Sequence, residues 1–304
     1  MVVRDRPHPD ANLGVGVRGE IRSGTERTAD QPPAQSGFGI IRQMARLTRL
    51  SRSIAGRIAL VTGAASGMGR STAHLFADEG ARVAVTDLKR EGVDRVVEEI
   101  RAAGGEARGW ALDVADADRI PVVVGEVTER LGAIDILVNN AGIPVGASLD
   151  QDDEEYEASW QRALAVMLTA HMRLVRACLS GLVGKGEGRI INIASTEALG
   201  ATAGVGPYTV AKHGVIGLTR SLAIELGPKG VTVNCVCPGP ILTGMTEAIP
   251  QSSREKFARR RVPLRRYGEP EEVAHATLSL ALPAASYLNG VVLPVDGGMT
   301  IQNS

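Results

Sequence analysis

Short apolar runs alternate with amphipathic stretches along the chain from about Arg57 onward. Runs of this length are typical of strands buried on both faces, and the stretches between them carry apolar residues at helical spacing. This alternation is the pattern of a parallel sheet whose crossover helices cover both of its faces. We therefore predict an α/β fold with strands over residues 58–61, 82–86, 107–112, 134–138, 189–193 and 231–237 and near 293–295.

The first 52 residues differ in composition from the remainder. They carry nine Arg and five acidic residues, and their Pro and Gly make residues 1–37 typical of disordered sequence. Residues 40–54 place apolar side chains at roughly helical spacing among arginines, as in a transit peptide or a membrane-surface helix. A flexible extension and a natural start at Met44 are simpler alternatives. We predict an N-terminal extension over residues 1–52, largely disordered with a candidate Arg-rich amphipathic helix at 40–54, and one domain over 53–304.

Composition argues against several classes of protein. Lys plus Arg and Asp plus Glu both total 34, so the net charge of zero offers no attraction for nucleic acid. No apolar run reaches the ~18 residues that a membrane span needs. Cys235 and Cys237 alternate onto one face of a predicted strand, and no His/Cys cluster accompanies them. We predict reduced core cysteines of a cytoplasmic protein and no metal site.

A glycine-rich loop follows the first predicted strand. Its sequence, Thr62-Gly-Ala-Ala-Ser-Gly-Met-Gly69, leads directly into helical periodicity. Glycines there permit a tight turn and the close approach of a pyrophosphate, which the helix N-terminus stabilises. The spacing of Gly63, Gly67 and Gly69 differs from the G-x-G-x-x-G of most dinucleotide dehydrogenases. We expect this loop to bind the phosphates of a nucleotide.

Polar residues stand where later strands end. Asp87 ends the second strand, where a carboxylate accepts hydrogen bonds from ribose hydroxyls and repels a 2′-phosphate. A helix N-cap is the simpler interpretation of Asp87. The fourth strand runs into Asn139-Asn-Ala-Gly142, whose small and amide residues suit a floor beneath a cofactor. Because parallel sheets bind ligands at this edge, the pattern predicts a dinucleotide site there.

Tyr208 and Lys212 lie four residues apart in a helix predicted to begin near Tyr208, so they share one helix face. A nearby ammonium favours the phenolate, and we expect the pKa of Tyr208 to fall from ~10 toward the operating pH. Proton transfer with an alcohol requires such a shift. Ser195 ends the fifth strand region, and no histidine–carboxylate pair marks it as a nucleophile. Since Y-x-x-x-K pairs also occur by chance, the interpretation depends on the motifs around this one.

Together these motifs resemble the short-chain dehydrogenase/reductase family, in its 3-oxoacyl reductase-like and secondary-alcohol dehydrogenase branch. The glycine loop, the N-N-A-G at 139–142, the Ser195, Tyr208 and Lys212 set and the P-G-x-x-x-T at 238–243 occur in the family's order. The resemblance extends from about residue 57 to residue 298. It implies a single Rossmann-type doubly wound domain, with a seven-stranded parallel sheet and helices on both faces.

The resemblance also implies roles for single residues. Ser195, Tyr208 and Lys212 would be catalytic, and Lys212 would also reach the nicotinamide ribose. Asp113 stands where the family binds adenine, and Ser66 stands where members that use the phosphorylated cofactor carry a basic residue. The implied cofactor is therefore NAD(H), with NADP(H) as the alternative. The implied cofactor-binding residues are Thr62, Gly63, Ser66, Gly67, Met68, Gly69, Asp87, Asp113, Val114, Asn140, Ala141, Gly142, Tyr208, Lys212, Pro238, Gly239, Ile241 and Thr243.

The sequence after the fourth predicted strand departs from the family's pattern at one position, and some of its residues allow two interpretations. Within a long helix predicted over 154–182, Met167 replaces the asparagine that helps to hold a relay water behind the lysine. A thioether is a poor hydrogen-bond acceptor. Glu197 adds negative charge close to the expected pocket. We expect residues 244–262 to form a mobile loop over the substrate, with the arginines at 259–261 facing either an anionic substrate tail or solvent.

The expected function is that of an NAD(H)-dependent oxidoreductase, interconverting a secondary alcohol and a ketone with Tyr208 as general acid/base. One alternative is a 3-oxoacyl-[acyl-carrier-protein]/CoA reductase that uses NADPH. Another is an NAD(H)-binding sensor or scaffold with impaired catalysis, which Met167 favours. The expected partners are a small-molecule alcohol or ketone and further copies of the chain, as a tetramer or dimer. Neither nucleic acid nor a membrane span is expected.

Overall fold

The computed structural model describes residues 47–302. The predictions for residues 1–46, including disorder, a targeting helix and a start at Met44, lie outside the described residues. Residues 47–54 form no helical turn, so the candidate helix at 40–54 does not extend through them. Thr48 and the residues after it belong to one compact unit.

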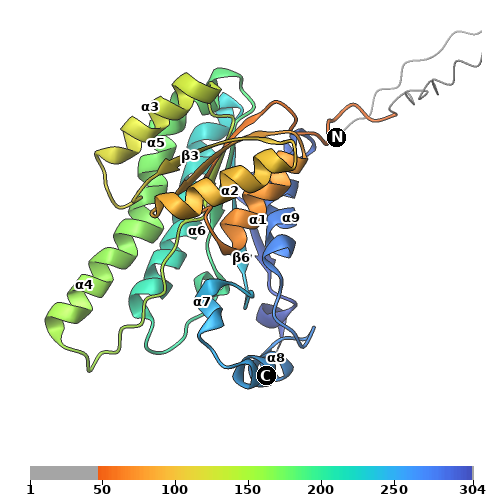
Figure 1. Ribbon diagram of the computed structural model, residues 1–304. Coiled ribbons are helices and arrows are strands. Elements are labelled where there is room, and N and C mark those ends of the chain that lie inside the picture. The colour runs from red at the N-terminus through yellow and green to blue at the C-terminus, as the bar shows by residue number, and fades with distance from the viewer. Residues whose placement is uncertain (1–46, 303–304) are drawn as a thin grey trace, which may run out of the picture. The chain divides into compact units, whose positions relative to one another are not determined.

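Seven parallel strands form the central sheet (Figure 1). Its order is β3-β2-β1-β4-β5-β6-β7. Strands β2 and β3 therefore follow β1 on one side, and β4 to β7 follow on its other side. The strands are β1 (Ile58–Thr62), β2 (Arg82–Asp87), β3 (Glu106–Ala111), β4 (Ile136–Asn139), β5 (Arg189–Ile193), β6 (Thr232–Pro238) and β7 (Val292–Val295). All seven predicted strands are present, with ends within two residues of the predicted ones, and the predicted fold class is confirmed.

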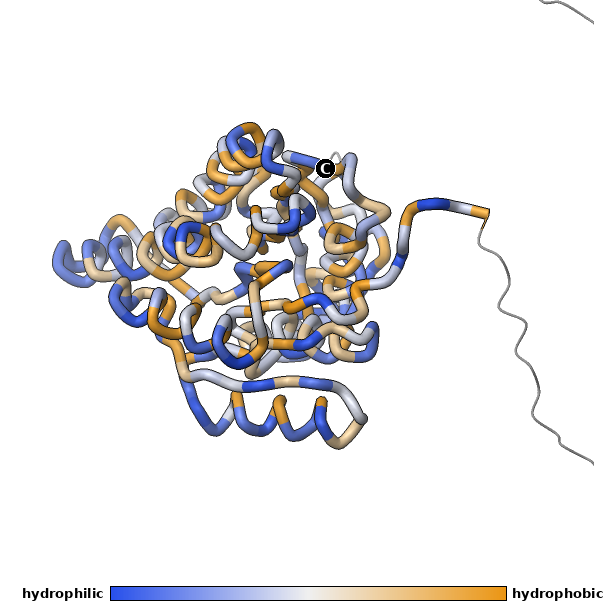
Figure 2. Tube along the Cα trace, turned by 90° about the horizontal axis from the view of Figure 1, so that it is seen from above, coloured by the Kyte–Doolittle hydropathy of each residue, from blue (hydrophilic) through white to orange (hydrophobic). Residues whose placement is uncertain are grey.

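Helices pack on both faces of this sheet (Figure 1). On one face, α1 (Gly67–Asp78), α2 (Arg90–Ala102) and α9 (Pro270–Ala281) bury side chains such as Phe76 against the strands. On the other, α3 (Arg119–Leu131), α5 (Ala170–Gly184) and α6 (Gly206–Leu226) do the same. Figure 2 shows that hydrophilic positions gather on the outer sides of the peripheral helices. Burial of both sheet faces explains the continuous apolar runs in the sequence.

The long helix predicted over 154–182 is present but interrupted. It consists of α4 (Asp153–Leu164), a π-helical turn at Ala165–Thr169 and α5. Across the turn, the Ala170 N–H donates to the carbonyl oxygen of Ala165, one residue further back than in an α-helix. Turns of this kind are rare and often accompany functional sites. The interruption is centred on Met167, so the backbone bends here although the asparagine is absent.

Length and composition alone would allow the Asp153–Gly184 stretch to cross a membrane, since its most apolar window has a mean hydropathy of 1.3. In the folded domain this stretch packs against the central sheet. Within that window 44% of the residues are buried inside the domain, where α5 packs against β4, β5 and α6. The core helix of a folded domain meets the same criteria.

The segment after β6 differs from its prediction. Residues 244–262 are not a loop: they form α7 (Gly244–Glu247) and α8 (Gln251–Arg261). Thr243 caps α7 in a reciprocal box with Thr246. Arg259, Arg260 and Arg261 occupy the last turn of α8, where positive charge favours the C-terminal end of the helix dipole. Local capping and this charge placement explain why the polar, Gly-containing stretch is helical.

Candidate active site

The carboxyl ends of β1, β4 and β5 meet where the strand order reverses, which is where open parallel sheets bind ligands. A cleft of about 480 Å³ opens there. It contains Tyr208 and Lys212 and most of the residues expected to bind a cofactor. Its lining residues are Gly63, Ser66, Gly67, Met68, Gly69, Asp87, Leu88, Leu112, Asp113, Val114, Asn140, Ala141, Gly142, Ile143, Pro144, Arg162, Val166, Ile193, Ala194, Tyr208, Lys212, Thr243, Gly244 and Met245.

The glycine loop is shaped by close backbone contacts. Gly63 has a φ of +64°, a value that favours glycine, and a methyl group there would lie 2.8 Å from the Cα of Ala141. A methyl group on Gly69 would lie 2.1 Å from the Gly63 carbonyl oxygen. Only glycine fits these positions. The turn brings Ser66 and Gly67 to the N-terminus of α1, where backbone N–H groups can hold phosphates.

Thr62 lies beneath the loop and not in the cleft wall. It is buried, and its Oγ1 accepts hydrogen bonds from the backbone amides of Asn140 (3.0 Å) and Ala141 (3.1 Å). The Asn140 Nδ2 donates to the carbonyl oxygens of Thr62 (2.8 Å) and Gly63 (3.1 Å). These bonds join the ends of β1 and β4, which hold the two sides of the cleft at a fixed separation.

Two aspartates stand at neighbouring strand ends on the cleft wall. The Asp87 carboxylate accepts from the amides of Ala65 (2.9 Å) and Leu88 (2.7 Å), and Lys89 rather than Asp87 is the N-cap of α2. Asp113 accepts from the guanidinium of Arg162 at 3.3 Å. Neither is buried, so both carboxylates keep lone pairs that can accept from a ligand.

Ser195 and Tyr208 come together from different elements. Ser195 follows β5 and caps a short 3-10 turn, where its Oγ accepts from the Glu197 amide at 3.1 Å. Tyr208 is the third residue of α6, and its hydroxyl is close enough to the Ser195 side chain for the serine to lower the pKa of the tyrosine. Ser195 itself does not line the cleft. The Tyr208 side chain therefore lines the cleft, and the Ser195 side chain stands next to it.

Lys212 lies on the same face of α6 as Tyr208, as predicted, and is almost fully buried. Its Nζ lies 5.6 Å from the centroid of the Tyr208 ring and donates to the Ile193 carbonyl oxygen at 2.9 Å. Burial lowers the pKa of Lys212 to about 8, although the neighbouring cysteines raise it. The ammonium is thus held close to the tyrosine by the end of β5.

The predicted fall in the pKa of Tyr208 is wrong for this structure. Burial raises its pKa, the hydrogen bond with Ser195 lowers it by less, and the negative charge of Glu197 raises it further. The desolvation of a phenolate outweighs the hydrogen bond because the ring is mostly enclosed. At neutral pH Tyr208 is therefore a phenol, the form that donates a proton.

Glu197 does not point freely into the cleft. Its carboxylate accepts from the Thr202 amide (3.0 Å), from the Thr202 hydroxyl and from the Thr209 hydroxyl (3.1 Å). These bonds tie the loop after β5 to the first turn of α6. The Glu197 carboxylate therefore connects the residues that follow Ser195 to the residue after Tyr208. Its negative charge also raises the pKa of Tyr208.

The segment after β6 closes the other side of the cleft. The Gly239 amide donates to the Val295 carbonyl oxygen at 3.0 Å, and a methyl group on Gly239 would lie 2.8 Å from the Cα of Asp296. Pro238, Gly239 and Ile241 therefore support the wall from behind. Of the four residues predicted here to bind the cofactor only Thr243 lines the cleft, and Gly244 and Met245 line it next to Thr243.

Sequence motifs did not identify every residue of the cleft. Arg162 belongs to α4 and pairs with Asp113, 49 residues away in the chain. Ile143 and Pro144 follow the N-N-A-G motif, and Val166 precedes Met167 in the π-helical turn. No motif marks these positions, and only a signal of long-range pairing, such as covariation between Arg162 and Asp113, could have identified Arg162.

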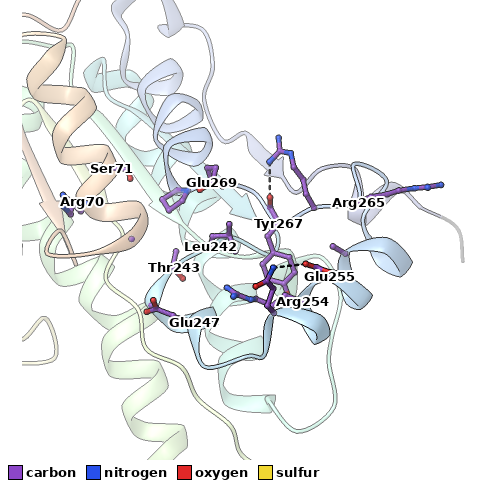
Figure 3. A pocket seen from close by; sticks show the side chains of 16 residues that line it. Arg70, Ser71, Leu242, Thr243, Glu247, Arg254, Glu255, Arg265, Tyr267 and Glu269 are labelled. Carbon is purple, nitrogen blue, oxygen red and sulfur yellow. Dashed lines mark hydrogen bonds between the residues drawn. The ribbon is translucent and has the colours of Figure 1, made fainter.

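Two further hollows adjoin the cleft. One, of about 630 Å³, lies beyond Gly67 and Thr243 and is lined by alternating Arg and Glu side chains, among them Arg254 and Glu255 (Figure 3). Arg70 at its edge is held by Glu99 at 2.9 Å. Neither Tyr208 nor Lys212 lines it, so the chemistry belongs to the first cleft.

The other hollow, of about 840 Å³, begins at Thr196 and Glu197, next to Ser195. Lys256, Arg260 and Arg261 line its opposite side from α8. It therefore begins one residue beyond the serine.

The cleft suits a dinucleotide by its own structure. A glycine-rich turn enters a helix N-terminus, two carboxylates stand at the ends of β2 and β3, and a small-residue floor lies between them. At the opposite end are two hydroxyls and a buried ammonium, the groups that manage an alcohol proton beside a hydride carrier. Among residues 47–302, no cluster of His, Cys, Asp and Glu could hold a metal ion.

Comparisons with known proteins agree with this geometry. A family model described as enoyl-(acyl carrier protein) reductase matches residues 63–300. The 3-oxoacyl-[acyl-carrier-protein] reductase FabG of Thermotoga maritima is 40% identical over 246 residues, covering 81% of this chain and 98% of the relative. The meso-2,3-butanediol dehydrogenase of Serratia marcescens is 38% identical over 244 residues, covering 80% and 94%.

A solved structure extends the comparison to a bound cofactor. A crystal structure of a Beutenbergia cavernae protein, described as an NAD(P)-dependent gluconate 5-dehydrogenase with bound NADP, has a TM-score of 0.76 and 37% identity. The match covers 83% of this chain and 99% of that one. The fold is therefore shared over about four fifths of this chain.

Proposed function

Because the chain belongs to the short-chain dehydrogenase/reductase family, we propose that it interconverts a secondary alcohol and a ketone with NAD(H), with Tyr208 as general acid/base. The chain is an oxidoreductase of CH–OH groups that binds NAD or NADP. The proposal adds to this a preferred cofactor and roles for residues. The observation that supports it most is that Tyr208 and Lys212 line the cleft together, with Ser195 next to Tyr208.

In ketone reduction, Tyr208 donates its proton to the carbonyl oxygen while Ser195 holds that oxygen by a hydrogen bond. In alcohol oxidation, Tyr208 accepts the hydroxyl proton. Lys212 stabilises the phenolate that ketone reduction leaves and that alcohol oxidation requires, because its Nζ lies 5.6 Å from the ring centroid. A bound nicotinamide supplies or accepts the hydride. The raised pKa of Tyr208 favours the phenol at rest, which is the form that ketone reduction uses.

NAD(H) is the proposed cofactor because of the residues at the ribose end of the cleft. The Asp87 carboxylate would accept from ribose hydroxyls and repel a 2′-phosphate. Ser66 provides no positive charge to offset that repulsion. The comparison of kcat/KM with NAD and NADP on one substrate tests this, and a clear preference for NADP would overturn it.

The Tyr208→Phe variant tests the mechanism. Removing the hydroxyl should lower kcat by about 10²–10⁴-fold, the usual contribution of general acid–base catalysis. NADH binding, followed by fluorescence titration, should stay within about twofold of wild type, since the ring remains. Tyr287→Phe is the control, because Tyr287 is fully exposed and far from the cleft lining. Undiminished turnover in Tyr208→Phe would rule out this role.

A second candidate function is the reduction of 3-oxoacyl thioesters on a carrier protein or coenzyme A. The hollow beside Ser195 favours it, because Lys256, Arg260 and Arg261 could bind the phosphate of a pantetheine arm. The T. maritima relative bears that activity in its name. Reduction of acetoacetyl-CoA, compared with neutral cyclic ketones under both cofactors, separates the candidates. Cofactor binding without turnover of any substrate would instead indicate a sensor or scaffold.

We propose further that copies of the chain assemble as a tetramer or dimer through the outer faces of α4–α5 and α6, as the resemblance implies. Ile224 on α6 is 80% exposed in the single chain, which an interface would cover. Sedimentation analysis of the purified protein tests this, and a monomer at micromolar concentration would exclude it.

A further inference from the structure

Within residues 47–302, four buried polar side-chain atoms have no hydrogen-bond partner: Asn139 Oδ1, the Nδ1 and Nε2 of His171, and Thr232 Oγ1. An orphaned polar group costs roughly 1–3 kcal/mol, so such atoms are rare and call for an explanation. His171 is the extreme case, because it is 2% exposed and both of its ring nitrogens are unpaired.

His171 and Asn139 lie on the same face of the sheet. Alternate residues of a strand point to one face, so Asn139 shares the face of Leu137. Leu137 belongs to the apolar cluster that contains Ala170 and Leu174, the helical neighbours of His171. Helix α5 packs directly against β4. Three of the four orphaned atoms are therefore enclosed between α5 and the end of β4.

Lys212 borders the same region. The pKa of His171 is lowered to about 3, first by burial and then by the positive charge of Lys212, so the two side chains are within electrostatic reach. A methyl group on Gly142 would lie 3.9 Å from Met167 Sδ and 4.0 Å from Lys212 Nζ. Met167 precedes His171 by one helical turn on the same face. Lys212 and His171 are therefore both close to Met167, in the buried region behind Tyr208.

The hydrogen-bonding groups in this space are complementary. The Lys212 ammonium has three N–H donors, and the Ile193 carbonyl is its one hydrogen-bond acceptor among the described residues. A neutral imidazole has one donor and one acceptor, and the Asn139 oxygen is an acceptor. Asn139 is already fixed, because its Nδ2 donates to Asn192 Oδ1 at 2.8 Å. Met167 offers only a weak acceptor, so the ammonium needs a partner other than its sulfur.

We propose that His171 is a positioning residue that holds an ordered water against Lys212. The water accepts from the Lys212 Nζ and donates to one nitrogen of the neutral imidazole. Buried waters typically bridge groups of this kind. The bridge stabilises the ammonium form of Lys212 and so supports the phenolate of Tyr208. This inference rests on the proposed function for its effect on turnover.

Substitutions at His171 test the bridge through the pH profile of kcat. His171→Leu keeps an apolar filling of similar size but removes the acceptor, so Lys212 should lose its proton at lower pH. We expect the alkaline limb of the kcat profile to move down by at least about half a pH unit, with a three- to tenfold loss at pH 9. His171→Gln keeps an acceptor and should stay close to wild type.

Two further variants separate positioning from packing. Cys178→Ala changes a buried residue two turns further along α5 and should alter the melting temperature without moving the pH profile. Met167→Asn in the His171→Leu background returns an acceptor one turn away and should restore the alkaline limb. A His171→Leu variant that is less stable but has the wild-type profile would overturn the proposal.

Two measurements do not depend on turnover. In ¹⁵N spectra of the histidine-labelled protein, His171 should remain a single neutral tautomer from pH 5 to pH 8. A high-resolution crystal structure should show a water within hydrogen-bond distance of both Lys212 Nζ and His171. A dry site, or an imidazole that titrates near its ordinary pKa of about 6.5, would overturn the inference even if turnover were established. If the protein showed no turnover but the water was present, the result would contradict the proposed function and not the role of His171.

Discussion

The carboxylate of Asp87 has two tasks at the end of β2. It holds the glycine loop by accepting from the Ala65 amide at 2.9 Å, and it presents a negative charge to the ribose end of the cleft. The first task needs only an acceptor, whereas discrimination against a 2′-phosphate needs the charge. A substitution that keeps the hydrogen-bond acceptor but removes the charge can therefore separate the effect on stability from the effect on cofactor preference.

Asp87→Asn is that substitution. We expect the ratio of kcat/KM for NAD over NADP to fall by about tenfold or more, because one charge repelling the 2′-phosphate is removed. Stability should change little, since the amide oxygen still accepts from Ala65. Steady-state kinetics with both cofactors and a thermal melt measure the two effects. Asp94→Asn, in an exposed pair on α2, is the control. An unchanged ratio would show that Asp87 does not set the preference.

At the scale of elements, α1 and α2 are joined by one acidic residue. Glu99 on α2 accepts from Arg70 through two nitrogens at 2.9 Å and from His74 at 3.0 Å, both on α1. These bonds lower the pKa of Glu99 below its usual value, the pair with Arg70 contributing most. Because the first residues of α1 line the cleft, this contact helps to hold the helix on which the proposed cofactor site depends.

Glu99→Gln should weaken the domain in a pH-dependent manner. A carboxyl whose pKa is depressed in the folded state adds stability above its unfolded pKa, and loses it as the pH falls through the lower folded value. The variant should therefore be less stable than wild type at pH 7, by up to about 1 kcal/mol for such partly exposed groups. The difference should shrink below pH 4.5. Chemical denaturation across this range measures it, and a difference that is constant with pH would contradict the account.

At the scale of the whole molecule, the folded unit begins before the first strand. Ile54 is fully buried in the cluster beneath α1 and α9, and the Ser51 carbonyl oxygen accepts from the Ala284 amide at 2.9 Å. The domain boundary predicted after residue 52 falls between these two contacts. Residues on both sides of it therefore contact the rest of the domain, Ile54 in the apolar cluster and Ser51 at the turn after α9.

Truncation tests this boundary. A chain that starts at Met44 keeps both contacts and should match the full-length protein in melting temperature and in NADH binding. Ile54→Ala should cost about 2–5 kcal/mol, the usual penalty for emptying a buried aliphatic site. Leu50→Ala is the matched control, since that side chain is 57% exposed. Equal stability of the Ile54 and Leu50 variants would argue against a role for this segment.

Much of the fold and part of the site could be predicted from local pattern. The strands, the glycine loop and the shared face of Tyr208 and Lys212 all follow from spacing, because the periods of strands and helices are fixed by backbone geometry. The helices at 244–261 and the π-helical turn at Met167 were not predicted. Their formation depends on capping and on neighbours that spacing does not reveal.

The sequence by itself determined which residues follow the strands: a glycine-rich loop, an aspartate, an Asn-Asn-Ala-Gly turn, a serine and a tyrosine–lysine pair. Only the tertiary structure decided their electrostatics. Burial raises the pKa of Tyr208, and the Glu197 carboxylate accepts a hydrogen bond from Thr209. His171 is buried within electrostatic reach of Lys212. Desolvation and long-range pairing depend on what surrounds a group in space, and residues such as Arg162 and Asp113 meet only after the chain has folded.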